Sequence, residues 1–244
     1  MGYTVVIPLR EGLEFEASGA KLAIQRSVGE DCEVIVPRVP LDLGSFKSVR
    51  AFAKEVQAIL AGRGAGLSLL CLNAGRGGSR GDPHELTGDG QEAILQINAL
   101  SHMLLTAELL PLLRQAPKGA RVVSQSSGAR KLWRDDSDVP RRMVEEMNGR
   151  ANTAYDAFRY AEPRVRQSAK CRLRCCRRFN QCYSTVGLLT VSQYCLSKAA
   201  NCFFTLALNE RLVHAQTAAG RGHVIALATD PGFASTGEPA NPMR

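Results

Sequence analysis

Short apolar runs alternate with longer amphipathic stretches along most of this chain. The runs have the length of β-strands and lie at 3–9, 32–36, 67–72, 120–126 and 223–228. The stretches have the length of α-helices and lie at 12–28, 46–60, 90–113 and from about 194 to 213. Strands separated by helices pair in parallel, so the pattern predicts an α/β fold with a Rossmann-like doubly wound sheet and helices on both faces.

Two of the predicted helices carry clear apolar positions. In the second, Ser45 can cap a helix whose apolar residues recur at helical spacing: Phe46, Val49, Phe52, Val56 and Leu60. The third places Ile94, Ile97, Leu104 and Leu112 among its apolar positions. The run 67–72 is predicted to be a buried strand, with Cys71 a small buried residue like Cys195 and Cys202 on the last helix.

Polar or glycine-containing turns follow the predicted strands. They are Arg10, Asp42, Asn73-Ala74-Gly75, Ser126-Ser127 and Asp230-Pro231-Gly232. The carboxyl ends of parallel strands meet at one edge of a sheet, where ligands bind in folds of this kind. The arrangement therefore predicts a nucleotide site at this edge.

Tyr194 and Lys198 form the most informative pair of side chains. Residues four apart lie on the same face of a helix, and the pair is predicted near the start of the last helix. A fixed cation beside a phenol stabilises its phenolate, which suits the phenol to acid/base chemistry. The alternative is an aromatic core residue with a lysine extending past it to solvent.

Composition indicates one globular domain, 1–244, with 45% hydrophobic and 22% charged residues. No apolar run reaches the roughly 18 residues of a membrane span. The first ten residues lack the layout of a signal peptide. A cytoplasmic location is therefore the default, and a targeting segment that precedes this sequence is left open.

Almost all of the net charge of +8 comes from one short segment of the chain. Seven of the basic residues lie between 164 and 178, and without them the formal charge is +1. Four cysteines, Cys171, Cys175, Cys176 and Cys182, lie in the same segment at a spacing that is not typical of zinc sites. The segment belongs to an irregular insertion, 132–187, which is a substrate cover, a disordered loop or mistranslated sequence. Polyanion binding through 164–182 is the least favoured function, and nucleic acid is not an expected partner, because charge runs are usually solvated.

The motifs together resemble the short-chain dehydrogenase/reductase family, in particular its retinol dehydrogenase and light-dependent protochlorophyllide reductase branch. Tyr194 and Lys198 match the Y-x-x-x-K motif, Ser127 matches the catalytic serine, and Asn98 matches the fourth member of the tetrad. The cofactor motifs match Asp42, Asn73-Ala74-Gly75 and Pro231-Gly232 with Thr236. The match covers 1–129 and 188–237.

The resemblance implies hydride transfer between NADP and a hydrophobic carbonyl, alcohol or tetrapyrrole-like substrate, with NAD as the alternative cofactor. Tyr194 would give a proton to the substrate oxygen, Ser127 would hydrogen-bond it, and Lys198 would bond the ribose. Asn98 would hold a water that feeds protons to Lys198. Arg10 is suited to the 2′-phosphate of NADP. A homodimer through the helices of Asn98 and Tyr194 is left open.

Each of these residues also has a plainer interpretation. Arg10 could be a solvated charge, Asn98 a buried amide bonded to backbone, and Ser127 the end of a strand. Asn73-Ala74-Gly75 could be only a turn.

The chain departs from the family at both ends. It lacks the first strand and its glycine-rich turn, so it is predicted to be N-terminally truncated, and it ends soon after Thr236. In the doubly wound order the missing strand is central. We expect two strands on one side and the remaining strands on the other, with unpaired edges between them. The alternative function is therefore a catalytically inactive fragment of such an enzyme.

Overall fold

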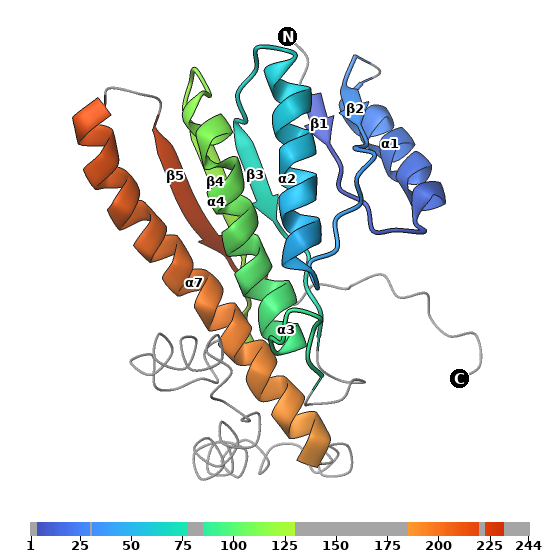
Figure 1. Ribbon diagram of the computed structural model, residues 1–244, viewed down its shortest axis with the longest axis vertical. Helices are drawn as coiled ribbons and strands as arrows, with labels where there is room; N and C mark the ends of the chain where they lie inside the picture. The colour runs from blue at the N-terminus through green and yellow to red at the C-terminus, as the bar shows by residue number, and fades with distance from the viewer. Residues whose placement is uncertain (1–3, 30, 78–84, 130–184, 220–222, 232–244) are drawn as a thin grey trace.

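The computed structural model describes residues 4–29, 31–77, 85–129, 185–219 and 223–231. In chain order the elements are β1 (Thr4–Val6), α1 (Glu14–Val28), β2 (Glu33–Ile35), α2 (Phe46–Ala61), β3 (Leu69–Leu72), α3 (Ala93–Leu95), the π-helical turn η1 (Gln96–Leu100), α4 (Ser101–Arg114), β4 (Ala120–Gln125), α7 (Thr185–Ala219) and β5 (Val224–Thr229) (Figure 1). The predicted alternation of strands and helices is confirmed. The basic segment 164–182 and nearly all of the insertion 132–187 lie outside the described residues.

The described strands form two separate parallel sheets. β1 pairs with β2, with Val5 opposite Val34. The second sheet has the order β3-β4-β5, with Leu70 opposite Val122 and Val122 opposite Ala226. Figure 1 shows β1 and β3 as the neighbouring edges of the two sheets. The α/β fold with parallel pairing is as predicted, and so is the division into two strands and the rest.

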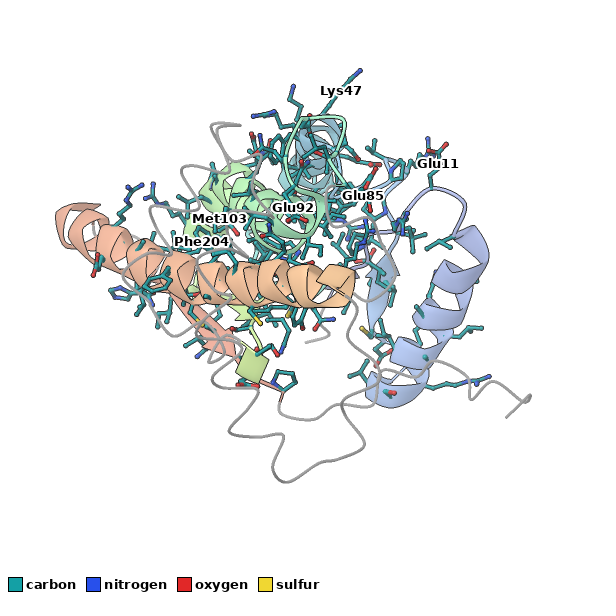
Figure 2. All side chains as sticks on the ribbon, turned by 90° about the horizontal axis from the view of Figure 1, so that it is seen from below. Glu11, Lys47, Glu85, Glu92, Met103 and Phe204 are labelled. Atoms are coloured by element: carbon teal, nitrogen blue, oxygen red, sulfur yellow. The ribbon has the colours of Figure 1, made fainter. Side chains whose placement is uncertain are left out.

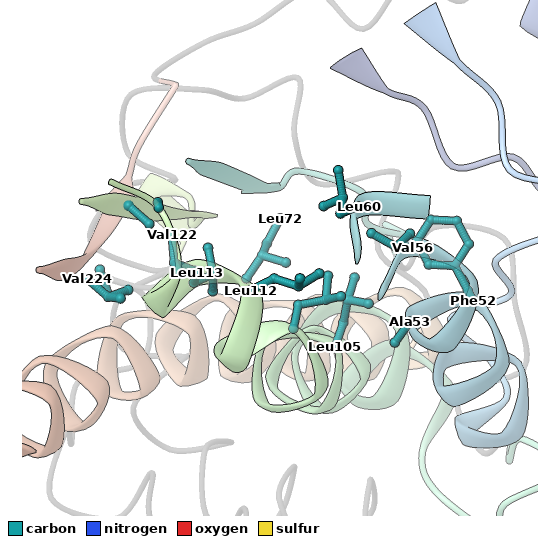
Figure 3. Close-up of a cluster of buried hydrophobic side chains, with 14 of the residues drawn as sticks. Phe52, Ala53, Val56, Leu60, Leu72, Leu105, Leu112, Leu113, Val122 and Val224 are labelled. Atoms are coloured by element: carbon teal, nitrogen blue, oxygen red, sulfur yellow. The ribbon is translucent and has the colours of Figure 1, made fainter. Parts of the chain in front are cut away.

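Helices α2, α4 and α7 cover one face of the three-stranded sheet and enclose the main apolar core (Figure 3). Side chains alternate across the sheet, so Leu70 and Leu72 turn toward this core. On the opposite face, Leu69, Ile225 and Leu227 are 43–51% exposed.

The prediction that Cys71 is buried is wrong, and the prediction that strand 67–72 is buried is right for only one of its faces, that of Leu72. Cys71 is exposed, together with Leu69. The physical reason is that no described helix covers the face of the sheet to which Leu69 and Cys71 belong, where Ile225 and Leu227 are exposed as well. Cys195 is buried and Cys202 is half-buried.

Helix α2 forms where its pattern predicts. The Ser45 hydroxyl accepts a hydrogen bond from the Ser48 N–H at 3.3 Å, which satisfies one of the unpaired donors at the helix start. The apolar stripe then packs in the core through Val49, Phe52, Val56 and Leu60, each at most 5% exposed. Glu55, on the polar side, accepts hydrogen bonds from the N–H groups of Arg38 and Val39, and so ties α2 to the segment after β2.

The helix that starts at Ala93 contains an irregularity that its sequence does not reveal. Gln96–Leu100 is wound as a π-helix, and Ser101 N–H bonds to the Gln96 carbonyl, five residues back. Ala93–Arg114 is long and apolar enough to cross a membrane by those two measures alone. Its buried residues, among them Leu105, Leu109 and Leu113, pack in the core of this fold.

Helix α7 starts earlier than predicted. It begins at Thr185, so Tyr194 lies more than two turns inside it rather than near its start. Between Leu188 and Tyr194 the sequence has no Gly or Pro that would end a helix, and its apolar residues, such as Leu188 and Leu189, continue the helical pattern.

Candidate active site

Lys198 is the centre of the polar cluster at the carboxyl ends of β3 and β4. It lies on α7 and is only 4% exposed. Its ammonium donates a hydrogen bond to the Gln125 carbonyl at 3.0 Å and lies 5.5 Å from the centroid of the Tyr194 ring. Burial lowers the pKa of Lys198, because removal from water penalises the charged form. The predicted pairing of Tyr194 and Lys198 on one helical face is present.

The Gln125 carbonyl, which accepts the hydrogen bond from Lys198, is held in place by further contacts between β4 and α7. It also accepts a hydrogen bond from the Asn201 amide at 3.1 Å. The buried Ser126 hydroxyl donates to the Lys198 backbone carbonyl at 2.8 Å, and the Cys202 thiol lies 3.2 Å from the same hydroxyl. These hydrogen bonds join the end of β4 to α7 on both sides of the Lys198 ammonium.

Asn98 ties three parts of the site together. Its side chain is completely buried in the π-helical turn. Its Oδ1 accepts from the Arg76 N–H at 2.7 Å, and its Nδ2 donates to the Arg76 carbonyl and to the Ser197 hydroxyl, each at 3.0 Å. The amide thus holds the chain just after the Asn73-Ala74-Gly75 turn against α7. This bonding matches the plainer interpretation of Asn98, a buried amide bonded to backbone.

Gly75 leaves the centre of the cluster open. A Cβ atom at this position would lie 3.3 Å from Asn98 Oδ1 and 3.4 Å from Lys198 Nζ. Any larger side chain would project toward the ammonium. Asn73, Ala74 and Gly75 are all exposed, so a ligand can reach this backbone from solvent.

His102 lies one helical turn after Asn98 and is 3% exposed. Burial and, to a smaller extent, the positive charge of Lys198 lower the pKa of His102 to about 4, while the Asn98 carbonyl acts in the opposite direction. Within the described part of the chain, the Nδ1 atom of His102 has no hydrogen-bond partner. The imidazole is therefore neutral at pH 7 and adds no second positive charge beside Lys198.

The other predicted residues lie farther from this cluster or outside the described chain. Ser127 is half-buried just after β4, and its hydroxyl accepts from the Ala129 N–H at 3.2 Å. Arg10 is exposed after β1, and Asp42 is exposed after β2, where its carboxylate accepts from the Gly44 N–H at 2.8 Å. Pro231 is exposed after β5, and Gly232 and Thr236 lie outside the described residues.

Sequence reasoning missed several residues that build the site. Gln125, Ser197 and Asn201 hold the ammonium and the Asn98 amide in place. A signal for two of them was present: Ser197 and Asn201 are polar positions four apart, which places them on one face of the helix. Figure 2 shows α7 passing beside the helical segment that carries Glu92 and Met103.

Comparison with known proteins finds relatives of this chain in sequence and in fold. A family model described as short chain dehydrogenase matches residues 11–134. Mouse polyprenol dehydrogenase is 45% identical over 92 residues, which cover 36% of this chain and 25% of that protein. Human retinol dehydrogenase 12 is 36% identical over 129 residues, which cover 52% of this chain and 36% of that protein. The matched segments thus span well under half the length of these relatives.

Alignments with solved structures of similar fold extend over nearly the whole chain. An NADPH-bound carbonyl reductase from chicken fatty liver aligns with a TM-score of 0.51 at 18% identity, over 92% of this chain and 66% of that one. A metagenomic short-chain oxidoreductase in complex with NADP aligns with a TM-score of 0.52 at 17% identity, over 94% of this chain and 71% of that one. At these identities the likeness shows the fold.

Proposed function

The chain belongs to the short-chain dehydrogenase family, and from that premise we propose that it is an NADP-dependent oxidoreductase that transfers hydride to or from a hydrophobic carbonyl or alcohol. The cofactor proposal is supported by the NADPH and NADP bound in the two fold relatives. The substrate proposal is supported by the relatives that carry polyprenol and retinol in their names.

The observation that carries the proposal is the buried Lys198 ammonium beside the Tyr194 ring. The Tyr194 hydroxyl is the group proposed to exchange a proton with a substrate oxygen, and Lys198 is the cation beside its ring. Ser127, at the end of β4, is the second donor proposed for that oxygen, and a preorganised donor of this kind contributes several kcal/mol to a transition state. Asn98 positions α7, which carries Tyr194, because its amide joins the chain just after Gly75 to Ser197 of this helix.

The residues around Gly75 fit a nicotinamide dinucleotide. The exposed turn Asn73-Ala74-Gly75 presents backbone without bulky side chains, and a Cβ at Gly75 would obstruct the Lys198 ammonium. Lys198 has three N–H donors and uses one on Gln125, so others remain for a ribose hydroxyl. Arg10, Asp42, Pro231, Gly232 and Thr236 are the further residues proposed to hold the cofactor. When bound, the nicotinamide would supply or accept the hydride.

Tyr194→Phe tests the chemical role of the phenol. We expect NADPH binding to survive and turnover with a retinoid or aliphatic carbonyl to fall at least a hundredfold, the usual scale of a lost acid/base group. Leu206→Ala is a matched control, because Leu206 lies on the same helix and is 60% exposed. If Tyr194→Phe keeps the activity of the wild-type chain, the proposed mechanism is wrong.

A catalytically inactive chain is the second candidate, and one observation favours it. The sheet of β1 and β2 is not hydrogen-bonded to the sheet of β3, β4 and β5, so Arg10 and Lys198 lie in parts that no backbone ladder joins. Titration of the folded chain with NADPH, followed by calorimetry, separates the two candidates. Micromolar binding supports the enzyme, and no binding by a folded sample supports the inactive chain.

A further inference from the structure

The π-helical turn η1 makes hydrogen bonds on two sides. On one side, Asn98 accepts from the Arg76 N–H and donates to the Ser197 hydroxyl of α7. Gln96 precedes Asn98 by two residues, and side chains two apart on a helix do not share a face. The Gln96 side chain is completely buried, and its amide nitrogen donates to the Asp89 carboxylate at 2.8 Å. The turn therefore has a second set of contacts, separate from those of Asn98.

Asp89 joins this second side of η1 to the start of helix α2. The oxygen Oδ2 of Asp89 that accepts from Gln96 also accepts from the Phe46 N–H at 2.7 Å. Phe46 is the first residue of α2, where N–H groups have no partner within the helix, and the first turn of α2 has no acidic residue of its own. The Phe46 side chain also packs against a buried apolar cluster, which consists of Leu95, Ala99, Leu100 and Ala200. One carboxylate oxygen thus holds the start of α2 against the π-helical turn.

A further hydrogen bond joins the same two parts of the chain. Ser101 directly follows η1, is completely buried, and donates from its hydroxyl to the Leu43 carbonyl at 2.6 Å. Leu43 follows Asp42, whose carboxylate accepts from the Gly44 N–H. The residues 42–46, here called the Asp42 turn, are therefore bonded to the helix of η1 and α4 at Leu43 and, through Asp89, at Phe46.

From these contacts we propose that Asp89 is a positioning residue that couples the Asp42 turn to the Asn98 amide. Asn98 holds α7 in turn, so a segment that binds the cofactor is connected to the helix that carries the proton donor. This role rests on the proposed function, in which Asp42 holds the cofactor and Tyr194 exchanges the proton. Asp89 acts in it without touching cofactor or substrate. A π-helical turn suits such a connection, because turns of this kind are frequent at functional sites.

The chain offers a conservative variant and a matched control for Asp89. Both of its hydrogen bonds go to one oxygen, so Asp89→Asn can keep them through the amide carbonyl, whereas Asp89→Ala removes both. Asp89 is exposed, so the alanine variant leaves no cavity in the core. Glu55 also ties α2 to another segment, by accepting from the N–H groups of Arg38 and Val39 at 2.8 and 2.6 Å. Glu55→Ala therefore removes two carboxylate bonds from the same helix without changing the contacts of η1.

The first measurement needs no ligand. Amide hydrogen exchange at Arg76 in the full chain, followed by NMR, reports how firmly Asn98 holds the Arg76 N–H. We expect Asp89→Ala to speed this exchange about tenfold, because η1 loses the contact that fixes it on its second side. Asp89→Asn and Glu55→Ala should stay within about twofold of the wild-type chain. Urea denaturation should show similar losses of stability for Asp89→Ala and Glu55→Ala, which separates the effect at Arg76 from general destabilisation.

The second measurement is the reduction of retinal by the same four chains with saturating NADPH. Asp89→Ala should lower kcat about tenfold and leave the KM for retinal within about twofold, because it displaces the helix of Tyr194 and not a group that binds the substrate. Asp89→Asn should restore kcat, and Glu55→Ala should keep it.

The two measurements separate this role from the proposed function. The role of Asp89 is overturned if Asp89→Ala leaves exchange at Arg76 unchanged, if Glu55→Ala speeds that exchange equally, or if Asp89→Asn behaves as Asp89→Ala does. It is also overturned if Asp89→Ala turns over retinal with the kcat of the wild-type chain. Absence of turnover by the wild-type chain would refute the proposed function instead, and faster exchange in Asp89→Ala alone would still support the coupling of the Asp42 turn to Asn98.

Discussion

The buried His102 makes a specific prediction about acid stability. Its pKa in the folded chain is about 4, against an ordinary value of 6.5. Between these values the unfolded chain binds a proton that the folded chain does not, so folding loses stability as the pH falls from 6.5 toward 4. A difference of about 2.5 pH units corresponds to roughly 3 kcal/mol, all of it present above pH 6.5.

His102→Gln isolates this contribution, because glutamine is of similar size and does not titrate. The free energy of unfolding would be measured for both chains by urea denaturation, followed by circular dichroism, at pH 7, 6, 5 and 4. Glu92 works in the opposite direction, since burial raises its pKa and its stabilising effect is lost as the pH rises. Glu92 is present in both chains, so the difference between their curves removes its effect.

We expect the wild-type chain to lose roughly 3 kcal/mol more than His102→Gln over this range. The gap between the two chains should change most between pH 6 and pH 4.5 and level off below pH 4. Two parallel curves would refute the reasoning, because they would mean that His102 is protonated equally easily in the folded and unfolded chains.

Three further predictions concern packing and the site. Asn98→Ala removes three hydrogen bonds and should lower the free energy of unfolding by about 2–4 kcal/mol in urea denaturation, and lower kcat more than it raises KM. Phe52→Ala should cost about 3–5 kcal/mol, because Phe52 is 4% exposed in the core. Gly66→Ala should cost about 1–3 kcal/mol, because its Cβ would lie 2.6 Å from the backbone of Ala116, whereas Gly77→Ala, with open space around it, should change little. Stability of Asn98→Ala or Gly66→Ala equal to that of the wild-type chain would contradict these assignments.

Much of the fold was predictable because its helices and strands have strong local patterns. The stripe of α2 and the cap at Ser45 depend on residues within one helix, and both are present as predicted. The burial of strand 67–72 was not predictable in this way. An apolar run indicates a strand, but whether its outer face is covered depends on elements elsewhere in the chain, and Leu69 and Cys71 are exposed.

The sequence predicted which side chains carry the chemistry of the site, but not the hydrogen bonds that hold them in place. The spacing of Tyr194 and Lys198 places both on one helical face without any tertiary information. The partners of Asn98 could not be read from spacing, because Arg76 and Ser197 come from different elements far apart in the sequence. The π-helical turn also adds one residue to its helix, so Leu105 and Leu109 are buried while the expected Leu104 is only half-buried.

That π-helical turn has a genetic consequence. The turn holds one residue more than an α-helix would need for the same rise, and its wider winding absorbs this residue, so the helical segments before and after it keep the phase of a continuous α-helix. Loss of a single codon within Gln96–Leu100 would therefore let the helix close as a regular α-helix and leave Glu92 and Ile94 beside their present neighbours. Loss of a codon within Ser101–Arg114 would instead rotate the residues before it by about 100° relative to those after it.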